Sequence, residues 1–224
     1  MEEIKNMNSC VMLAANLSTP VLLNCVFDSG DLKDTGIQYD SHVTLLYARD
    51  KKLGESEVLS EVQGVRLSLG MEAPNLTQYL SNHKSNAEFA VPVFDVFDLD
   101  IFENDSDYVV LKVKEEGNIW YDTLVNINKA LSEKFGVVSD FSNYTPHLTL
   151  AELEKGTARS YVGSESLRLI LEDSTIHFED IILSYGREGV SKYEVIDLTT
   201  NCSVDRFFRV RQMRKEAKRL DQEV

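Results

Sequence analysis

The sequence predicts an α+β protein in which strands and helices are mixed in two rough halves. Short β-branched and apolar runs alternate with amphipathic stretches, and no linker rich in Pro, Gly or Ser divides the chain. With 224 residues, of which 43% are hydrophobic, the chain is long enough to bury a full core without disulfides or metal. At about 150 residues per domain, this length corresponds to one or two domains.

The first half contains apolar and β-branched runs separated by polar segments. The expected elements are a strand over 10–17, a helix or a second strand over 18–27, a loop over 28–40, a strand over 41–48 and a helix over 55–62. Ser18, Thr19 and Pro20 are typical of a helix start, and Gly64 is typical of a helix end. Residues 65–86 carry several Gly, Pro and Asn residues, and we expect an inserted irregular loop there.

The second half contains the clearest helical periodicity. The expected elements are strands over 87–98, 108–113, 146–153, 175–184 and 192–198, a helix over 119–135, a helical or loop segment over 155–168, and a basic helix over 205–220. Residues 104–107 (NDSD) are typical of a turn. Gly136 is typical of a helix end and follows the helix expected over 119–135. We therefore expect one domain over 1–200, with the insertion at about 65–86, followed by a basic C-terminal helix over 201–224.

The charge limits the partners that the protein can bind. The formal net charge is −14, from 23 Lys and Arg against 37 Asp and Glu. Residues 206–224 hold seven basic and three acidic side chains, a net of +4, which leaves −18 for the rest. This acidity argues against a long nucleic acid lying across the surface and against an anionic membrane. We expect a small anionic partner, with RNA as an alternative recruited by the basic tail, and the oligomeric state is open.

The cysteines and the first residues bear on the compartment. Cys10, Cys25 and Cys202 are odd in number and form no CxxC motif, so free thiols are expected. The first six residues, MEEIKN, are acidic where a signal peptide is basic, and the apolar run 11–27 is interrupted by polar residues. We expect a cytoplasmic protein, in the host cytoplasm if the source is viral.

Two of the four histidines stand in nearly the same context. His42 begins His-Val-Thr-Leu, and His147 begins His-Leu-Thr-Leu. Residues i and i+2 of a strand face the same side, so each motif presents an imidazole and the hydroxyl of Thr44 or Thr149 together. One such motif is no signal, but two copies that use half of the histidines indicate a shared site.

Two histidines and two threonines suit the cleavage of a phosphodiester. One neutral imidazole can take a proton from the attacking hydroxyl or water, and one imidazolium can protonate the leaving oxygen. The threonine hydroxyls can donate to phosphate oxygens where negative charge develops. Zinc would need a third ligand, and neither His83 nor His177 stands in a ligand-spaced motif. We therefore expect no metal and no cofactor.

The paired motifs resemble the 2H phosphoesterase superfamily, which includes the 2′-5′ RNA ligase-like (LigT) proteins, cyclic phosphodiesterases and phage anti-CBASS nucleases. The resemblance covers roughly residues 10–198. Segment 146–151 (PHLTLA) is similar to the second motif of the family, 11–17 to its first strand, and 181–195 to its closing hairpin. Glu152 stands where many LigT-like members have a basic residue, which argues against RNA-end recognition of that kind.

The resemblance implies a bilobal, pseudosymmetric fold in which two antiparallel sheets form a central cleft with helices outside. It implies that His42 and His147 are the acid–base pair and that Thr44 and Thr149 hold phosphate. It also implies that Tyr185 and Arg187, in the closing hairpin, contact substrate at the rim of the cleft. Tyr144, three residues before His147, is a further candidate substrate contact.

The sequence thus predicts a metal-independent phosphodiesterase that acts on a small nucleotide or a cyclic oligonucleotide, including a cyclic-nucleotide immune signal. Two alternatives stay open. One is an RNA-processing enzyme acting on 2′,3′-cyclic ends or 2′-5′ linkages, and the other is a protein that binds a nucleotide and sequesters it without turnover.

Overall fold

The computed structural model describes residues 7–39, 41–68, 91–116, 118–138, 144–187, 194–197 and 202–203. The strands are β1 (Met7–Leu17), β2 (Leu32–Ile37), β3 (His42–Ala48), β4 (Val91–Pro92), β5 (Phe97–Glu103), β6 (Asp107–Val113), β7 (His147–Leu153), β8 (Thr175–Arg187), β9 (Glu194–Asp197) and β10 (Cys202–Ser203). The helices are the 3₁₀ helix η1 (Pro20–Cys25), α1 (Glu55–Ser68), α3 (Val93–Val96), α4 (Ile119–Phe135), α5 (Ala158–Val162) and α6 (Glu165–Glu172).

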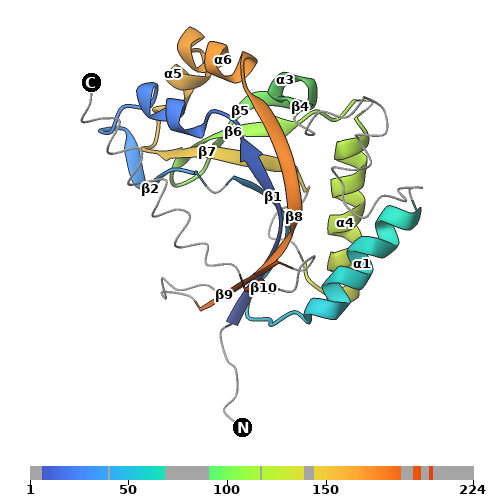
Figure 1. Cartoon of the computed structure of the whole chain (residues 1–224). Coiled ribbons are helices and arrows are strands. Elements are labelled where there is room, and N and C mark those ends of the chain that lie inside the picture. The colour runs from blue at the N-terminus through green and yellow to red at the C-terminus, as the bar shows by residue number, and fades with distance from the viewer. Residues whose placement is uncertain are drawn as a thin grey trace.

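The fold is α+β, with one curled antiparallel sheet and helices on its outside (Figure 1). The strand order is β10-β9-β8-β1-β3-β7-β6-β5, with β2 added to β7 and β4 to β8. The two expected sheets are therefore two arms of one continuous sheet. One arm runs from β10 to β3, the other runs from β7 to β5, and they join where β3 pairs with β7. The α+β class and the outer helices confirm the sequence prediction, and the central cleft stays a prediction.

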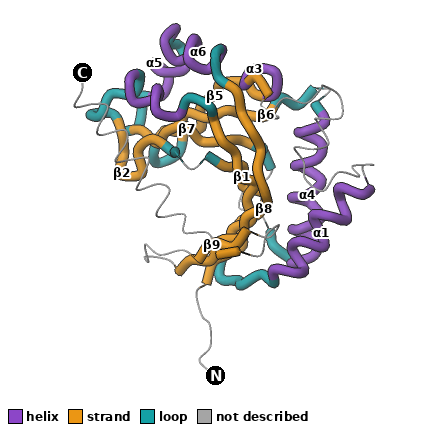
Figure 2. Tube along the Cα trace, viewed as in Figure 1, coloured by secondary structure: helices purple, strands orange, loops and turns teal. Residues whose placement is uncertain are grey.

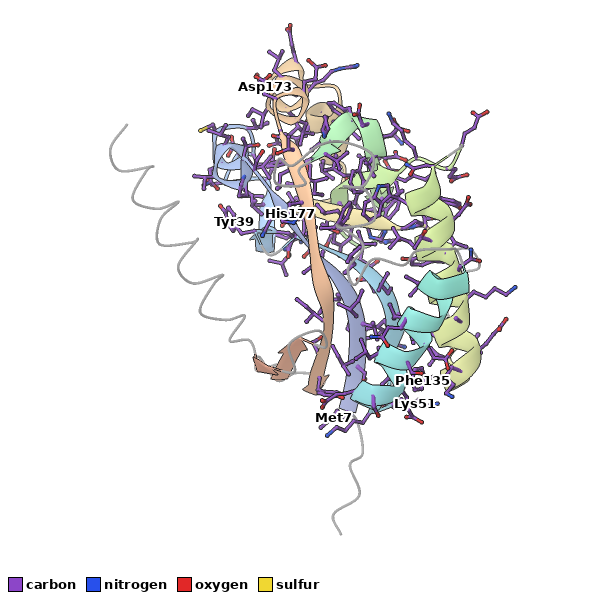
Figure 3. The ribbon with its side chains drawn as sticks, turned by 45° about the vertical axis from the view of Figure 1, so that its right-hand side comes forward. Met7, Tyr39, Lys51, Phe135, Asp173 and His177 are labelled. Carbon is purple, nitrogen blue, oxygen red and sulfur yellow. The ribbon has the colours of Figure 1, made fainter. Side chains whose placement is uncertain are left out.

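The helices cover the two arms separately, as Figure 2 shows. Helices α1 and α4 lie side by side along the arm of β1 and β3, while α5 and α6 lie at the other end. Helix α4 is capped at its start by Asn118, whose side chain accepts from the Trp120 amide, and at its end by Gly136, whose φ of 59° suits glycine. The Lys51 ammonium donates to the Phe135 carbonyl at that end (Figure 3). These contacts explain why the helix has the bounds that its periodicity predicts.

The structure corrects three sequence-based expectations. The expected loop over 28–40 contains β2, because backbone pairing of Leu32 with Leu153 and of Ile37 with Ala151 overrides its polar composition. Helix α1 continues through Gly64 to Ser68, because packing of its buried face outweighs the cost of about 1 kcal/mol for a helical glycine. Residues 65–68 of the expected insertion are thus helical, and 69–86 lie outside the described residues.

The third correction concerns the expected strand over 87–98. Only Val91 and Pro92 of its described part are paired before the chain turns into α3, and β5 starts at Phe97. Proline lacks the N–H that a ladder needs, so the strand cannot continue regularly. The remaining strands and the turn at 104–107 lie within a few residues of their expected places.

The last described element lies close to the expected end of the domain. Strand β10 puts Cys202 and Ser203 in the sheet, past the expected domain boundary at 200. The expected basic helix over 205–220 lies outside the described residues. In the part of the chain that is described, no helix is both long and apolar enough to cross a bilayer.

Candidate active site

The two His-x-Thr motifs open the two strands that join the arms. His42 is the first residue of β3, and His147 is the first residue of β7. Both strands show the same alternation over their first four residues, with His and Thr half-buried and the residues between them fully buried. Val43 and Leu148, each 0% exposed, face the apolar core, as the sequence predicts.

The register brings the two motifs together. Val43 pairs with Leu148 in an antiparallel ladder. Because residue numbers run in opposite directions along such a pair, His42 lies across from Thr149 and Thr44 lies across from His147. The four side chains form a square on one face of the sheet, with the two histidines at diagonal corners, where neighbouring residues are typically about 7–8 Å apart.

The neighbouring strands repeat this arrangement about a pseudo-twofold axis between β3 and β7. On β1, Met12 pairs with Thr44 and Ala14 pairs with His42. On β6, Val110 pairs with Thr149 and Lys112 pairs with His147. Segment 11–14 (VMLA) therefore corresponds to segment 109–112 (VVLK), and each lies on the outer side of its motif strand. This internal repeat is a signal that sequence reasoning missed.

Each motif strand carries a β-bulge directly after its threonine. The β1–β3 register passes from Val11–Leu46 to Met12–Thr44 and skips Leu45. The β6–β7 register skips Leu150 in the same way. Bulges bend a strand and re-aim its side chains, and they are frequent beside active sites. Here both occur at the same offset, so they bend the two motifs alike.

The carbonyls of the two bulged leucines have partners outside the bulged ladders. The Leu45 carbonyl accepts from the side-chain amide of Asn128 on α4, at 2.6 Å. The Leu150 carbonyl accepts from the backbone N–H of Gln38, at 2.8 Å. A buried carbonyl without a partner costs about 1–3 kcal/mol, so these bonds stabilise the bulges.

The protonation state of His147 follows from its surroundings. Its Nδ1 lies 2.8 Å from the Thr145 carbonyl, which can only accept, so Nδ1 carries the proton and Nε2 is left as the acceptor of the neutral ring. The ring of Phe102 contacts the imidazole edge-on, with centroids 4.6 Å apart. Burial lowers the pKa of His147 below its ordinary value of 6.5, against the opposing effect of the Thr145 carbonyl. His147 is therefore neutral at pH 7.

Replacing Phe102 by Ala is expected to raise the pKa of His147 toward 6.5, because water then reaches the imidazole and solvates its charged form. The imidazole resonances of His147 in an NMR pH titration measure this shift. Phe94→Ala is the control, because Phe94 packs against the core from α3. An unchanged pKa in Phe102→Ala would show that the phenyl ring does not desolvate the histidine.

Tyr144 links the two motifs. Its hydroxyl donates to the backbone carbonyl of Thr44 at 2.8 Å, across the seam between β7 and β3. Burial raises the pKa of this hydroxyl well above its usual value of 10, so it stays a donor. The structure thus gives this hydroxyl a backbone partner within the protein, whereas its expected contact with substrate stays a prediction.

Tyr144→Phe is expected to keep the ring packing but to lose this bond, which costs about 1 kcal/mol of the free energy of unfolding. Because the bond sets the position of Thr44 relative to His147, kcat should fall more than KM rises. Urea unfolding and steady-state kinetics measure the two effects. Tyr161→Phe is the control for a loss of stability without an effect on kcat, because Tyr161 lies on α5, where its hydroxyl donates to Asp31 and accepts from the Asp28 N–H.

The structure does not bring the closing-hairpin candidates to the four motif residues. Tyr185 is 4% exposed, belongs to the main core and donates to the Leu53 carbonyl at 2.7 Å. The backbone of Arg187 pairs with Met7, seven residues before Ala14 along β1, or about 23 Å at 3.3 Å per residue. Figure 3 shows Met7 at the end of the strands, away from His177. The side chain of Arg187 lies outside the described part.

Lys112 lies beside the second motif, and the sequence alone did not single it out. Its pairing with His147 places it on the same face of the sheet, next to the motif. A lysine within the otherwise apolar stretch 109–113 was the available signal, but only the register shows what it faces. Within the described residues, no group of three His, Cys, Asp or Glu side chains is arranged to hold a metal ion.

Comparisons with known proteins find similar solved structures but no matching sequence. No protein-family model matches the sequence, and no curated protein matches it. A solved structure of Kluyveromyces marxianus Usb1 with uridine monophosphate is similar over 87% of this chain and 99% of that one, at 15% identity and a TM-score of 0.42. A second structure of Kluyveromyces marxianus Usb1 covers 86% and 98%, at 14% identity and a TM-score of 0.37. At these scores the likeness assigns no role to any residue of this chain.

Proposed function

We propose that the protein is a metal-independent phosphodiesterase that acts on a small nucleotide substrate through His42 and His147. The observation that carries the proposal is the square of two histidines and two threonines at the β3–β7 seam. The resemblance of both motifs to the 2H phosphoesterase superfamily supports the same chemistry. The net charge of −14 favours a small substrate over a long polyanion.

His147 acts as the general base. It is neutral at pH 7, and its Nδ1 proton is held by the Thr145 carbonyl, so the Nε2 lone pair is ready to accept a proton. It takes the proton of a water or a 2′-hydroxyl as that oxygen forms its bond to phosphorus. His42 takes the remaining role and gives its proton to the leaving oxygen as the second P–O bond breaks.

The diagonal arrangement suits this reaction. The attacking and leaving oxygens lie on opposite sides of phosphorus in phosphoryl transfer. Histidines at opposite corners of the square reach the two oxygens separately, and the threonines at the other corners lie beside the non-bridging oxygens. Their hydroxyls donate where negative charge grows, which lowers the barrier without a metal ion.

A substrate panel tests the proposal. The protein is incubated in EDTA with 2′,3′-cyclic nucleotides, 2′-5′ and 3′-5′ dinucleotides, and cyclic di- and trinucleotides. Mass spectrometry identifies the products. We expect cleavage of at least one phosphodiester in EDTA. If no substrate is cleaved, the proposal that the protein is a phosphodiesterase is refuted. If activity disappears when EDTA is added, the metal-free mechanism is refuted.

The same panel separates the finer alternatives. Cleavage confined to cyclic oligonucleotides would favour an immune signal and the anti-CBASS branch. Cleavage of 2′,3′-cyclic ends or 2′-5′ linkages would favour RNA processing. Tight binding of a nucleotide without turnover would favour sequestration, and His42→Ala with His147→Ala would then leave the outcome of the assay unchanged.

A further inference from the structure

The pseudo-twofold symmetry of the site is broken at one pair of positions. Lys112 on β6 pairs with His147, and the corresponding residue on β1, Ala14, pairs with His42. The other flanking residues match, since Met12 and Val110 are both apolar and buried. One side of the proposed phosphate seat therefore carries a cation where the symmetry-related position carries a methyl group.

The surroundings of Lys112 contain an anion within reach of its ammonium group. The Lys112 ammonium lies 3.1 Å from the Glu115 carboxylate, and 31% of the lysine side chain is exposed. Two further carboxylates lie on β5. Asp98 pairs with Lys112 across the β5–β6 ladder and lies 3.8 Å from the Lys114 ammonium, and Asp100 accepts from the Ile101 N–H. The ion pair with Glu115 raises the pKa of Lys112, so the ammonium group is charged at neutral pH.

We infer that Lys112 forms a subsite for a second phosphate of the substrate, next to the phosphate held between the histidines. The inference rests on the proposed function, because it takes the histidine square as the seat of the first phosphate. Neighbouring strands lie about 4.8 Å apart, so the stem of Lys112 starts one strand spacing from His147. A lysine ammonium is a compact donor well suited to phosphate.

Glu115 acts as the counterion that the second phosphate replaces. In the free protein its carboxylate neutralises Lys112, and its own side chain is 56% exposed and free to swing into water. The Asp98 and Asp100 carboxylates repel an incoming anion, and the Lys114 ammonium is held by Asp98 and the Phe94 carbonyl, so binding of the second phosphate depends on the charge of Lys112. Because Ala14 lacks a charge, this contact also fixes which end of the substrate lies beside His147.

Two stable probes test the subsite. Adenosine 3′,5′-bisphosphate and adenosine 5′-monophosphate contain no phosphodiester, so neither is consumed, and calorimetry gives a dissociation constant for each. A charged hydrogen bond to phosphate contributes roughly tenfold in Kd, so we expect the bisphosphate to bind about tenfold more tightly. Lys112→Gln should remove this preference, Lys112→Arg should keep it, and Glu115→Gln should enlarge it.

Lys134→Gln is the matched control. Lys134 on α4 pairs with Glu61 at 3.5 Å, so this variant makes the same change of charge and also breaks an ion pair with a glutamate. Its preference should equal that of the wild type. Equal affinity of the wild type for both probes, no binding of either, or a preference that survives Lys112→Gln would overturn the subsite. Failure of the substrate panel would instead refute the proposed function and leave the binding ratio to decide the subsite.

Discussion

Replacing either motif histidine by alanine is expected to lower kcat by about 10²–10⁴-fold, the usual contribution of a positioned acid or base. His147→Ala removes the group that accepts the proton of the nucleophile, and His42→Ala removes the donor to the leaving oxygen. Because the two act on one transition state, the double variant should lose far less than the product of the single losses. Single-turnover rates on the substrate that the panel identifies measure the losses in the two single variants and in the double variant.

His177→Ala is the control for these variants. His177 is half-buried on β8 and pairs with Asn16 on β1, so it belongs to neither motif strand. Its removal should leave kcat within a fewfold of the wild type. Full activity of His42→Ala or His147→Ala, in a protein that still binds the nucleotide, would contradict the assignment of the pair.

Thr44→Val and Thr149→Val are each expected to lower kcat by about 10²–10³-fold, the range for loss of one donor to a developing oxyanion. Valine has nearly the shape of threonine and favours strands, so the fold should persist. KM should change little, because the hydroxyls bind the charged transition state more strongly than the ground state. Steady-state kinetics on the same substrate separates the two constants.

Serine at either position keeps the hydroxyl and should recover most of the activity. Thermal unfolding of each variant checks that strand β3 or β7 is intact. If the valine variants retain kcat, or if serine fails to rescue it while the fold is stable, the threonines do not donate to the reacting phosphate.

Local periodicity was sufficient to predict the faces of the two motifs. A strand that starts at His42 or His147 must place Thr44 or Thr149 on the same face, and burial of Val43 and Leu148 follows from the same alternation. Helix α4 was predicted with its bounds, because its periodicity and Gly136 are local signals. The α+β class rests on the sum of such local patterns.

Features that depend on pairing between distant segments were not predictable from local sequence. The bulges at Leu45 and Leu150 exist only relative to β1 and β6, and the place of Lys112 beside His147 comes from register. Strand β2 forms because β7 offers it a partner. The hydroxyl of Tyr185 donates to the Leu53 carbonyl, 132 residues away in the chain, and no local sequence pattern predicts that contact.

The pH dependence of kcat/KM, measured in EDTA on the substrate that the panel identifies, tests the two-histidine mechanism most directly. We expect a bell-shaped profile whose acid limb lies below pH 6.5, because the base must be neutral and burial lowers the pKa of His147. The acid limb should disappear in His147→Ala and persist in His177→Ala. A profile without an acid limb, or one that His147→Ala leaves unchanged, would contradict His147 as the base.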